Sequence, residues 1–559
     1  MSNCDSSNNL DTFMVSTYAE SLSTSAEDHL NIKPPRAIAS LEADSIVNPP
    51  VTELSRPLMQ PQATLEPIPH LPPEILLCIF RFIAGGIYRC HRDSFKLTMS
   101  LLAVSRTWRH LALGCFELWS TLYAGLSIRL FEMFLDRSGN VPLEFHYSFI
   151  PCRRFAQHIS ALSPHRNRLV VCCLHRIWSR RAIYSLLEEA FPALEVLSLS
   201  STLRALCRDY SWHAEQPIPA GAQLCLTNAP RLRELFLKGV YFPLWPHTPI
   251  YLTKLTLSHL SYYLPGEFSL LFRALEAAPL LEELHLRYID TSNLRTRPRP
   301  ADAPIQLPRL HTMAVENPAP RDIAQYILSS IIAPPLSSFT FVGKSLPLLD
   351  LILPQWSSFH TNFPGLTCIR DLDVAVTCED FIETAHVTVT VTGLPAQSEV
   401  PVFRISFIQH RDDISNDTFP LVMEGLHRAL PELPFLATLS LSNYSPPSAS
   451  SPARQSDTVQ LFAEFLARHT QIEELALTGF CNPWTEVLAT TLHGHLCPRM
   501  RKLTLVRCPI VSELLMDIVS SRAKSNSGQL DELLLRDCLH IHEATVARLG
   551  LLVAHVESQ

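Results

Sequence analysis

The stretch that decides the fold is Leu281-Glu282-Glu283-Leu284-His285-Leu286, because its spacing of leucines recurs along the chain. Close copies are Ile472-Glu473-Glu474-Leu475-Ala476-Leu477 and Leu530-Asp531-Glu532-Leu533-Leu534-Leu535. In this Leu-x-x-Leu-x-Leu pattern the last two leucines alternate with other residues, as on one face of a β-strand. Eleven copies, the seventh of them weak, start at Leu194, Leu232, Leu252, Leu281, Leu310, Leu336, Ile369, Leu436, Ile472, Met500 and Leu530.

Helix-like stretches, such as residues 268–277 and 459–469, lie between the copies. Each unit is therefore a short strand followed by a return helix, and it can bury its apolar face only by stacking on its neighbours. The sequence predicts an α/β fold, a horseshoe-like solenoid of parallel strands with return helices, over residues 191–559. Two alternating runs, residues 386–391 and 403–407, fall in the longest gap between copies and predict a two-stranded insertion near 380–410.

Strand alternation also predicts which side chains form the concave face of the solenoid. The leucines point inward, and the residues between and beside the last two leucines point outward. The candidates for binding a protein partner are Glu234, Phe236, Lys238, Glu283, His285, Arg287, Lys502, Glu532 and Arg536. The alternative for any one of them is an ordinary solvated position.

The N-terminal part of the chain divides at about residue 69. Residues 1–68 are rich in Ser, Asn, Asp and Pro and show no apolar period, so we expect a disordered tail. Residues 69–125 contain three helical patterns, over 72–83, 94–104 and 106–113, with Ser105 as an N-cap of the third. Three short helices form a small core, so an apolar face is expected to need a partner. Residues 126–190 are expected to be a linker or the first irregular repeats.

Composition excludes several classes of function. The chain has 559 residues and a formal charge of −7, which argues against a nucleic-acid-binding protein. The sequence lacks a signal peptide and the apolar run of about 18 residues that a membrane helix needs, so no membrane association is expected. The 15 cysteines are scattered and are expected to be reduced, as in the cytoplasm or nucleus.

Motifs that carry chemistry are few and incomplete. Gly343-Lys344-Ser345 could end a phosphate-binding loop, but Ser338 stands where that motif needs a glycine. His493-Gly494-His495-Leu496-Cys497 offers three possible metal ligands without a fourth. Cys172-Cys173 is more simply a pair of inert thiols than a reactive site. We therefore expect no catalytic residue, no metal and no cofactor.

Residues 71–122 resemble an F-box, and residues 135–145 resemble the segment that follows the F-box in the large fungal (basidiomycete-type) F-box family. The matching elements are Leu71-Pro72-Pro73-Glu74-Ile75-Leu76, then Val104-Ser105-Arg106-Thr107-Trp108-Arg109-His110-Leu111-Ala112, then Leu118-Trp119. The chain departs from many family members at Ser105, where they have Cys, and at Phe116, where they have Pro. The resemblance implies a three-helix domain that binds the adaptor of a cullin–RING ubiquitin ligase through Leu71, Pro72, Ile75, Leu76, Ile79, Val104, Trp108, Leu111 and Trp119.

Residues 190–540 resemble leucine-rich repeats. Two copies continue to Cys508 and Cys538, at the position where that family uses Asn or Cys, and both thiols are expected to be structural. Together the two resemblances imply a non-catalytic subunit of an SCF-type ubiquitin ligase, with the adaptor and through it a cullin as partners. The repeats would hold a protein substrate for ubiquitin-dependent degradation. The alternative is a non-degradative leucine-rich-repeat scaffold that only binds partners.

Overall fold

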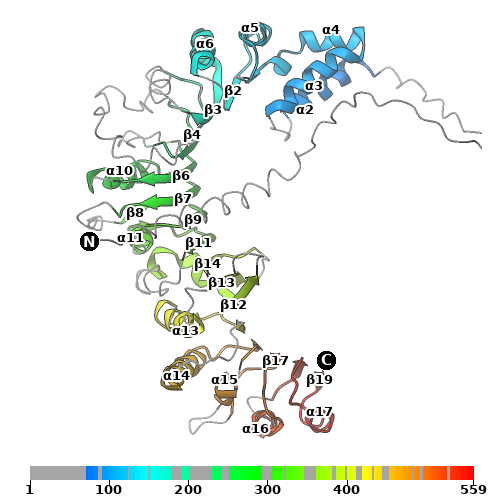
Figure 1. Cartoon of the computed structure of the whole chain (residues 1–559), viewed down its shortest axis with the longest axis vertical. Helices are drawn as coiled ribbons and strands as arrows, with labels where there is room; N and C mark the ends of the chain where they lie inside the picture. The colour runs from blue at the N-terminus through cyan, green and yellow to red at the C-terminus, as the bar shows by residue number, and fades with distance from the viewer. Residues whose placement is uncertain are drawn as a thin grey trace, which may run out of the picture. The chain divides into compact units, whose positions relative to one another are not determined.

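The computed structural model describes the chain from residue 71 onward, in segments (Figure 1). The described residues are 71–85, 91–123, 125–148, 152–177, 190–201, 229–240, 251–262, 265–292, 304–319, 323–344, 360–380, 385–396, 400–410, 418–430, 433–443, 452–480, 482–489, 495–524 and 529–558. They all belong to the second of two compact units, Met1–His70 and Leu71–Gln559. The tail expected over residues 1–68 lies outside the described residues.

Three helices open the described chain, as the sequence predicts. They are α2 (Pro73–Gly85), α3 (His91–Val104) and α4 (Arg106–Gly114). Helix α3 starts at His91, earlier than the expected residue 94. Ser105 is the N-cap of α4, because its hydroxyl oxygen accepts a hydrogen bond from the backbone N–H of Trp108 at 3.1 Å. An N-cap of this kind satisfies one of the free N–H groups at the start of a helix, so α4 begins directly after Ser105. This start agrees with the predicted one.

Nearly all of the strands that follow these helices join one long sheet, which contains seventeen strands within the described residues. In spatial order they are β1 (Thr121–Tyr123), β2 (Leu143–Ser148), β3 (Leu169–Ile177), β4 (Val196–Ser201), β5 (Glu234–Lys238), β6 (Lys254–Ser261), β7 (Glu283–Asp290), β9 (Thr312–Glu316), β11 (Ser338–Lys344), β14 (Phe403–His410), β13 (Ala385–Pro395), β12 (Ile369–Asp380), β15 (Thr438–Asn443), β16 (Glu474–Thr478), β17 (Lys502–Val506), β18 (Glu532–Arg536) and β19 (His555–Ser558). Neighbours are parallel except where β13 pairs with β12 and β14. A separate pair joins β8 (Ile305–Gln306) and β10 (Ile331–Ile332).

Helices and short helical turns connect the strands. They are η1 (Phe116–Trp119), α5 (Ile128–Arg137), α6 (Cys152–Leu162), η2 (Ser163–Arg168), α10 (Pro265–Glu276), α11 (Ile323–Ser329), η5 (Pro364–Thr367), α13 (Thr418–Ala429), α14 (Pro452–Arg468), α15 (Asn482–Glu486), α16 (Ser512–Ala523) and α17 (Glu543–Leu549). In Figure 1, α10, α11, α13 and α14 lie on the same side of the stacked strands. The predicted α/β fold, with mostly parallel strands and return helices, is therefore confirmed.

The leucines of the repeats lie in register and form the core. Leu235, Leu255 and Leu284 are paired across β5, β6 and β7, and all three are almost fully buried. The same row continues with Leu475, Leu503 and Leu533 in the C-terminal strands. Because each unit covers the apolar face of the next, a single core extends from Phe80 to Val553.

Strands β13 and β14 lie in the region where the sequence predicts a two-stranded insertion. Their place in the sheet could not be predicted. The chain passes from β11 to β12, turns back as β13, and returns as β14, which pairs in parallel with β11. Phe339 and Phe341 of β11 are paired with Phe403 and Ile405, so β14 takes the position of the next repeat. The weak copy at Ile369 is a true repeat strand, since Leu372 is paired with Leu439 of β15.

The sheet also begins earlier than the first recognised copy. Strands β1, β2 and β3 precede residue 190, and Leu122, Phe145 and Cys172 continue the buried row toward Leu197 of β4. These strands place repeat units between residues 121 and 177, a region expected to be a linker or irregular repeats. Phenylalanine and cysteine stand where later copies have leucine, so the leucine pattern is not visible there.

The turn after each strand has a common geometry. The second residue after the last leucine of a copy has a positive φ in seven repeats: Gly239, His259, Tyr288, Asn317, Gly479, Arg507 and Asp537. The N–H groups of Gly239, Gly479 and Arg507 each donate to a carbonyl of the next strand at 2.8 Å. The thiols of Cys508 and Cys538 donate to the carbonyls of Leu477 and Leu505, at 3.4 and 3.5 Å. Their predicted structural role is therefore confirmed.

Candidate functional site

Helix α2 exposes a stripe of apolar side chains. Ile75, Ile79 and Phe82 are 47%, 36% and 78% exposed, and Leu71, just before the helix, is 37% exposed. Steps of four and three residues keep Ile75, Ile79 and Phe82 on one side of the helix, and Leu71 precedes Ile75 by the same four residues. The opposite side of α2 is buried, with Leu76 and Phe80 in the core. We call Leu71, Ile75, Ile79 and Phe82 the α2 stripe.

Helix α3 also exposes apolar side chains, and helix α4 packs against both α2 and α3. Leu97 and Val104 of α3 are exposed, whereas Leu101 is buried. Trp108 of α4 is half-buried and its ring lies edge-on to Phe80 at 5.4 Å between centroids. Leu71, helix α2 and helix α3 together carry six of the large apolar side chains that are exposed among the described residues, and clustered apolar exposure is typical of a protein-binding surface.

The residues predicted to contact an adaptor divide between surface and core. Leu71, Pro72, Ile75, Ile79 and Val104 are exposed, Trp108 and Leu111 are half-buried, and Leu76 and Trp119 are buried. Phe82, Leu97 and Phe116 are also exposed but were not among the predicted residues. Phe82 could have been found, because it continues the helical spacing of Ile75 and Ile79 by one turn.

Trp119 joins the three helices to the first repeat. It is 1% exposed, and its indole N–H donates to the backbone carbonyl of Ala112 in α4 at 2.9 Å. Its ring lies edge-on to Phe134 of α5 at 4.9 Å, and the guanidinium of Arg137 lies 5.0 Å from the ring centroid. The indole thus has a partner for its single N–H donor while its ring is buried. Trp119 is therefore a core residue between helices α4 and α5.

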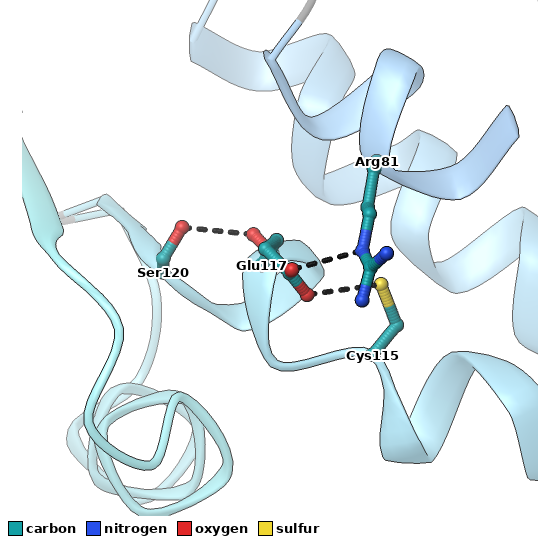
Figure 2. Close-up of polar contacts among 4 residues, drawn as sticks. All are labelled: Arg81, Cys115, Glu117 and Ser120. Carbon is teal, nitrogen blue, oxygen red and sulfur yellow. Dashed lines mark hydrogen bonds and ion pairs between the residues drawn. The ribbon is translucent and has the colours of Figure 1, made fainter. Parts of the chain in front are cut away.

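An ion pair fixes α2 against η1 (Figure 2). Arg81 on α2 donates through Nε to the Glu117 carboxylate at 3.0 Å, and the Cys115 thiol donates to the other carboxylate oxygen at 3.5 Å. The Ser120 hydroxyl donates to the backbone carbonyl of Glu117 at 2.8 Å. Burial acts to raise the pKa of Glu117, but hydrogen bonds from its own backbone N–H and from Cys115, together with Arg81, lower the pKa below its ordinary value.

The polar face of the sheet holds the residues predicted to bind a substrate. All nine alternate with buried leucines, as expected: Glu234, Phe236, Lys238, Glu283, His285, Arg287, Lys502, Glu532 and Arg536. They come from strands β5, β7, β17 and β18, which lie in two separate parts of the strand order. They therefore share a face of the sheet but do not form one site.

Ion pairs between neighbouring strands neutralise much of this face. Lys254 contacts Glu283 at 2.7 Å, and Lys502 contacts Glu532 at 3.0 Å. The hydrogen bond from Lys254 lowers the pKa of Glu283, and the hydrogen bond to Glu532 raises the pKa of Lys502. Burial lowers the pKa of His285, aided by the nearby charge of Arg287, so its imidazole is neutral at pH 7.

The incomplete chemical motifs have structural roles where they are described. Gly343 lies inside β11, not in a turn, and a Cβ there would lie 2.8 Å from the Phe341 ring. Cys172 is buried, and burial raises its thiol pKa, as expected for an inert thiol. Cys497 is also buried, with a pKa raised to about 12, while His493 lies outside the described residues. Among the described side chains, no group of three His, Cys, Asp or Glu residues could hold a metal ion.

Comparison with known proteins adds no further constraint. No protein-family model and no curated protein matches the chain. In the described segments, every helix is too short or too polar to cross a membrane. The surfaces that remain as candidates for function are the α2 stripe and the polar face of the sheet.

Proposed function

We propose that this protein is a substrate receptor of a cullin–RING ubiquitin ligase, with an F-box over residues 69–125 and leucine-rich repeats over 191–559. The observation that carries the proposal is the α2 stripe. It begins in the segment Leu71-Pro72-Pro73-Glu74-Ile75-Leu76, whose likeness to an F-box was noted from the sequence alone. Apolar helix faces of this kind dock into the grooves of partner proteins.

Several features support an interaction role for the remaining chain. The repeats present a polar face with charges of both signs, which suits a protein or peptide partner. Trp119 and Phe134 belong to the same buried cluster as Phe80 of α2 and the leucines of the repeats, so the helix that carries the stripe is packed against the repeat array. A receptor built in this way needs no catalytic residue of its own, because holding a substrate beside charged ubiquitin raises the effective concentration of its lysines.

The test is co-purification of the full chain with the ligase adaptor. The variant Leu71→Ala/Ile75→Ala/Ile79→Ala removes most of the α2 stripe without touching the buried side of the helix. We expect it to lose at least tenfold in adaptor binding, since anchors at the centre of an interface each contribute about 1–2 kcal/mol.

The matched control is Leu539→Ala/Leu551→Ala, which removes two leucines that are 91% and 85% exposed near the C-terminal end. It should bind the adaptor as the wild type does. Circular dichroism shows whether each variant is folded. Undiminished adaptor binding by the folded stripe variant would refute the proposal.

A further inference from the structure

The strand insertion creates a distinct patch on the polar face of the sheet. One register row crosses five strands there, from β11 through β14, β13 and β12 to β15. Its residues are Thr340, Arg404, Thr392, Asp373 and Ser440, in that order. The next row consists of Val342, Ser406, Thr390, Ala375 and Ser442.

Burial shows which face these residues occupy. Phe403 and Ile405 flank Arg404 on β14 and are fully buried, and Leu372 and Val374 flank Asp373 on β12 in the same way. Arg404 itself is exposed, and Asp373 is half-buried. Because side chains alternate along a strand, the row lies on the face opposite the core.

The charges of this row lack the pairing that joins several other charges on the same face. Lys254 stands opposite Glu283, Arg287 opposite Glu316, and Lys502 opposite Glu532, and each of these register neighbours forms an ion pair. The register neighbours of Arg404 are Thr340 and Thr392. Those of Asp373 are Thr392 and Ser440. Neither charge has an oppositely charged neighbour in its row.

The result is a cation and an anion held at a fixed separation. Among the described residues, Arg404 and Asp373 form no ion pair, and neither does Asp371, one position along the same face of β12. Arg404 and Asp373 are two strands apart, which is about 10 Å at the usual spacing of strands in a sheet. We call Arg404, Thr392, Asp371 and Asp373 the bipolar patch.

We propose that the bipolar patch binds a segment of a protein substrate in the polyproline II conformation that carries an acidic and a basic side chain three residues apart. This inference rests on the proposed function, since it names the kind of substrate that the repeats would hold. A polyproline II chain has three residues per turn and advances about 3.1 Å per residue, so side chains at positions i and i+3 lie on the same side, about 9 Å apart. The acidic side chain pairs with Arg404, and the basic one pairs with Asp373 and Asp371.

The hydroxyl groups around the two charges fit the same occupant. Thr340, Thr392, Ser406 and Ser440 can each donate and accept hydrogen bonds, as the backbone of an extended peptide requires. An apolar segment would leave the hydroxyl groups that it buries without hydrogen-bond partners, which disfavours its binding. A polyanion such as a nucleic acid would meet two carboxylates within the patch, so the charge pattern disfavours it.

The experiment measures binding of four labelled peptides to the purified full chain by fluorescence anisotropy at low salt. The peptides share a Gly/Ser background and carry Glu-x-x-Arg, Glu-x-x-Glu, Arg-x-x-Arg, or Glu and Arg as adjacent residues. Exposed charge pairs contribute up to about 1 kcal/mol each, so the Glu-x-x-Arg peptide should bind the wild type about three- to fivefold more tightly than the others.

Charge-changing variants test the assignment without relying on loss of binding. Arg404→Asp leaves only anions in the patch and should make Arg-x-x-Arg the preferred peptide. Asp373→Arg leaves Arg404 beside a second cation and should shift the preference toward Glu-x-x-Glu. The control Arg233→Glu, at an exposed position just before β5, should keep the wild-type order.

An unchanged order of preference in both patch variants overturns the inference, as does the absence of any preference or measurable binding in the wild type. A shift caused equally by Arg233→Glu would also overturn it, because the effect would then be one of overall charge. The adaptor is not present in this assay. Its result is therefore separate from the co-purification result that decides the proposed function.

Discussion

At the scale of single residues, the turn after each strand shows how backbone geometry constrains the repeat. Seven of these turns have a residue with positive φ, and only two of the seven are glycines, Gly239 and Gly479. A left-handed conformation is strained for residues with a Cβ, by about 1 kcal/mol or more. This conformation directs the backbone N–H toward the next strand, and the hydrogen bond it makes there offsets the strain. The N–H of Gly239, for example, donates to the backbone carbonyl of Ser258.

Gly239→Ala is expected to lower the free energy of unfolding by about 1 kcal/mol. The cause is the backbone conformation, with φ of +62°, because an added Cβ would meet only ordinary contacts with Ser201 at 3.6 Å and beyond. Urea denaturation measures the change. Gly550→Ala is the matched control, since Gly550 has φ of −61° and its Cβ would also meet ordinary contacts. The prediction is wrong if the two variants are equally stable.

At the scale of elements, the contact between α2 and η1 determines how the α2 stripe is held. Arg81 and Glu117 come from different elements and are both partly exposed, so their ion pair contributes no more than about 1 kcal/mol. The pKa of Glu117 is lower in the folded chain than its ordinary value of 4.5. Its ionised form therefore stabilises the fold at neutral pH, and that contribution is lost as the pH falls below the ordinary value.

Glu117→Gln is expected to lower the stability of the helical part slightly at pH 7 and to have a smaller effect at about pH 3. The glutamine keeps the shape of the side chain but removes the charge that Arg81 contacts. Thermal melts of both proteins across this pH range measure the difference. A difference that is the same at both pH values would show that the carboxylate charge of Glu117 makes no contribution.

At the scale of the whole described unit, stability depends on neighbouring repeats. Each strand pairs only with the strands on either side, and the leucines of each repeat pack against the leucines of the neighbouring repeats. Repeat arrays of this kind behave as a sum of units and nearest-neighbour contacts. A defect in one repeat should therefore destabilise its neighbours more than distant repeats.

Leu286→Ala and Leu505→Ala make this expectation testable, and each serves as the control for the other. Both leucines are fully buried, so each change should cost about 2–5 kcal/mol locally. Hydrogen exchange should become faster in β6, β7 and β9 for the first variant, and in β16, β17 and β18 for the second. Equal acceleration along the whole sheet in both variants would instead indicate a single cooperative unit.

The sequence alone determined the repeating unit and its local boundaries. Leucine spacing is a local property, so it predicted the parallel strands, the buried rows and the alternating polar face that includes Glu283 and Lys502. Local hydrogen bonding also made Ser105 predictable as an N-cap and Cys508 predictable as a turn thiol. The residues of the α2 stripe were partly found for the same reason, since a helix has a fixed period.

Only the tertiary structure decided which strands are neighbours and which helix residues remain exposed. The alternation in residues 386–391 predicts a strand, but its period does not specify a partner. The placement of β13 and β14 between β11 and β12, and with it the separation of Arg404 from Asp373, could not be predicted. Trp119 was assigned to a binding surface from its motif, yet it is buried. Phe134 and Arg137, which belong to the separate helix α5, pack on its ring. Strand order and burial depend on contacts between distant residues, which local spacing does not encode.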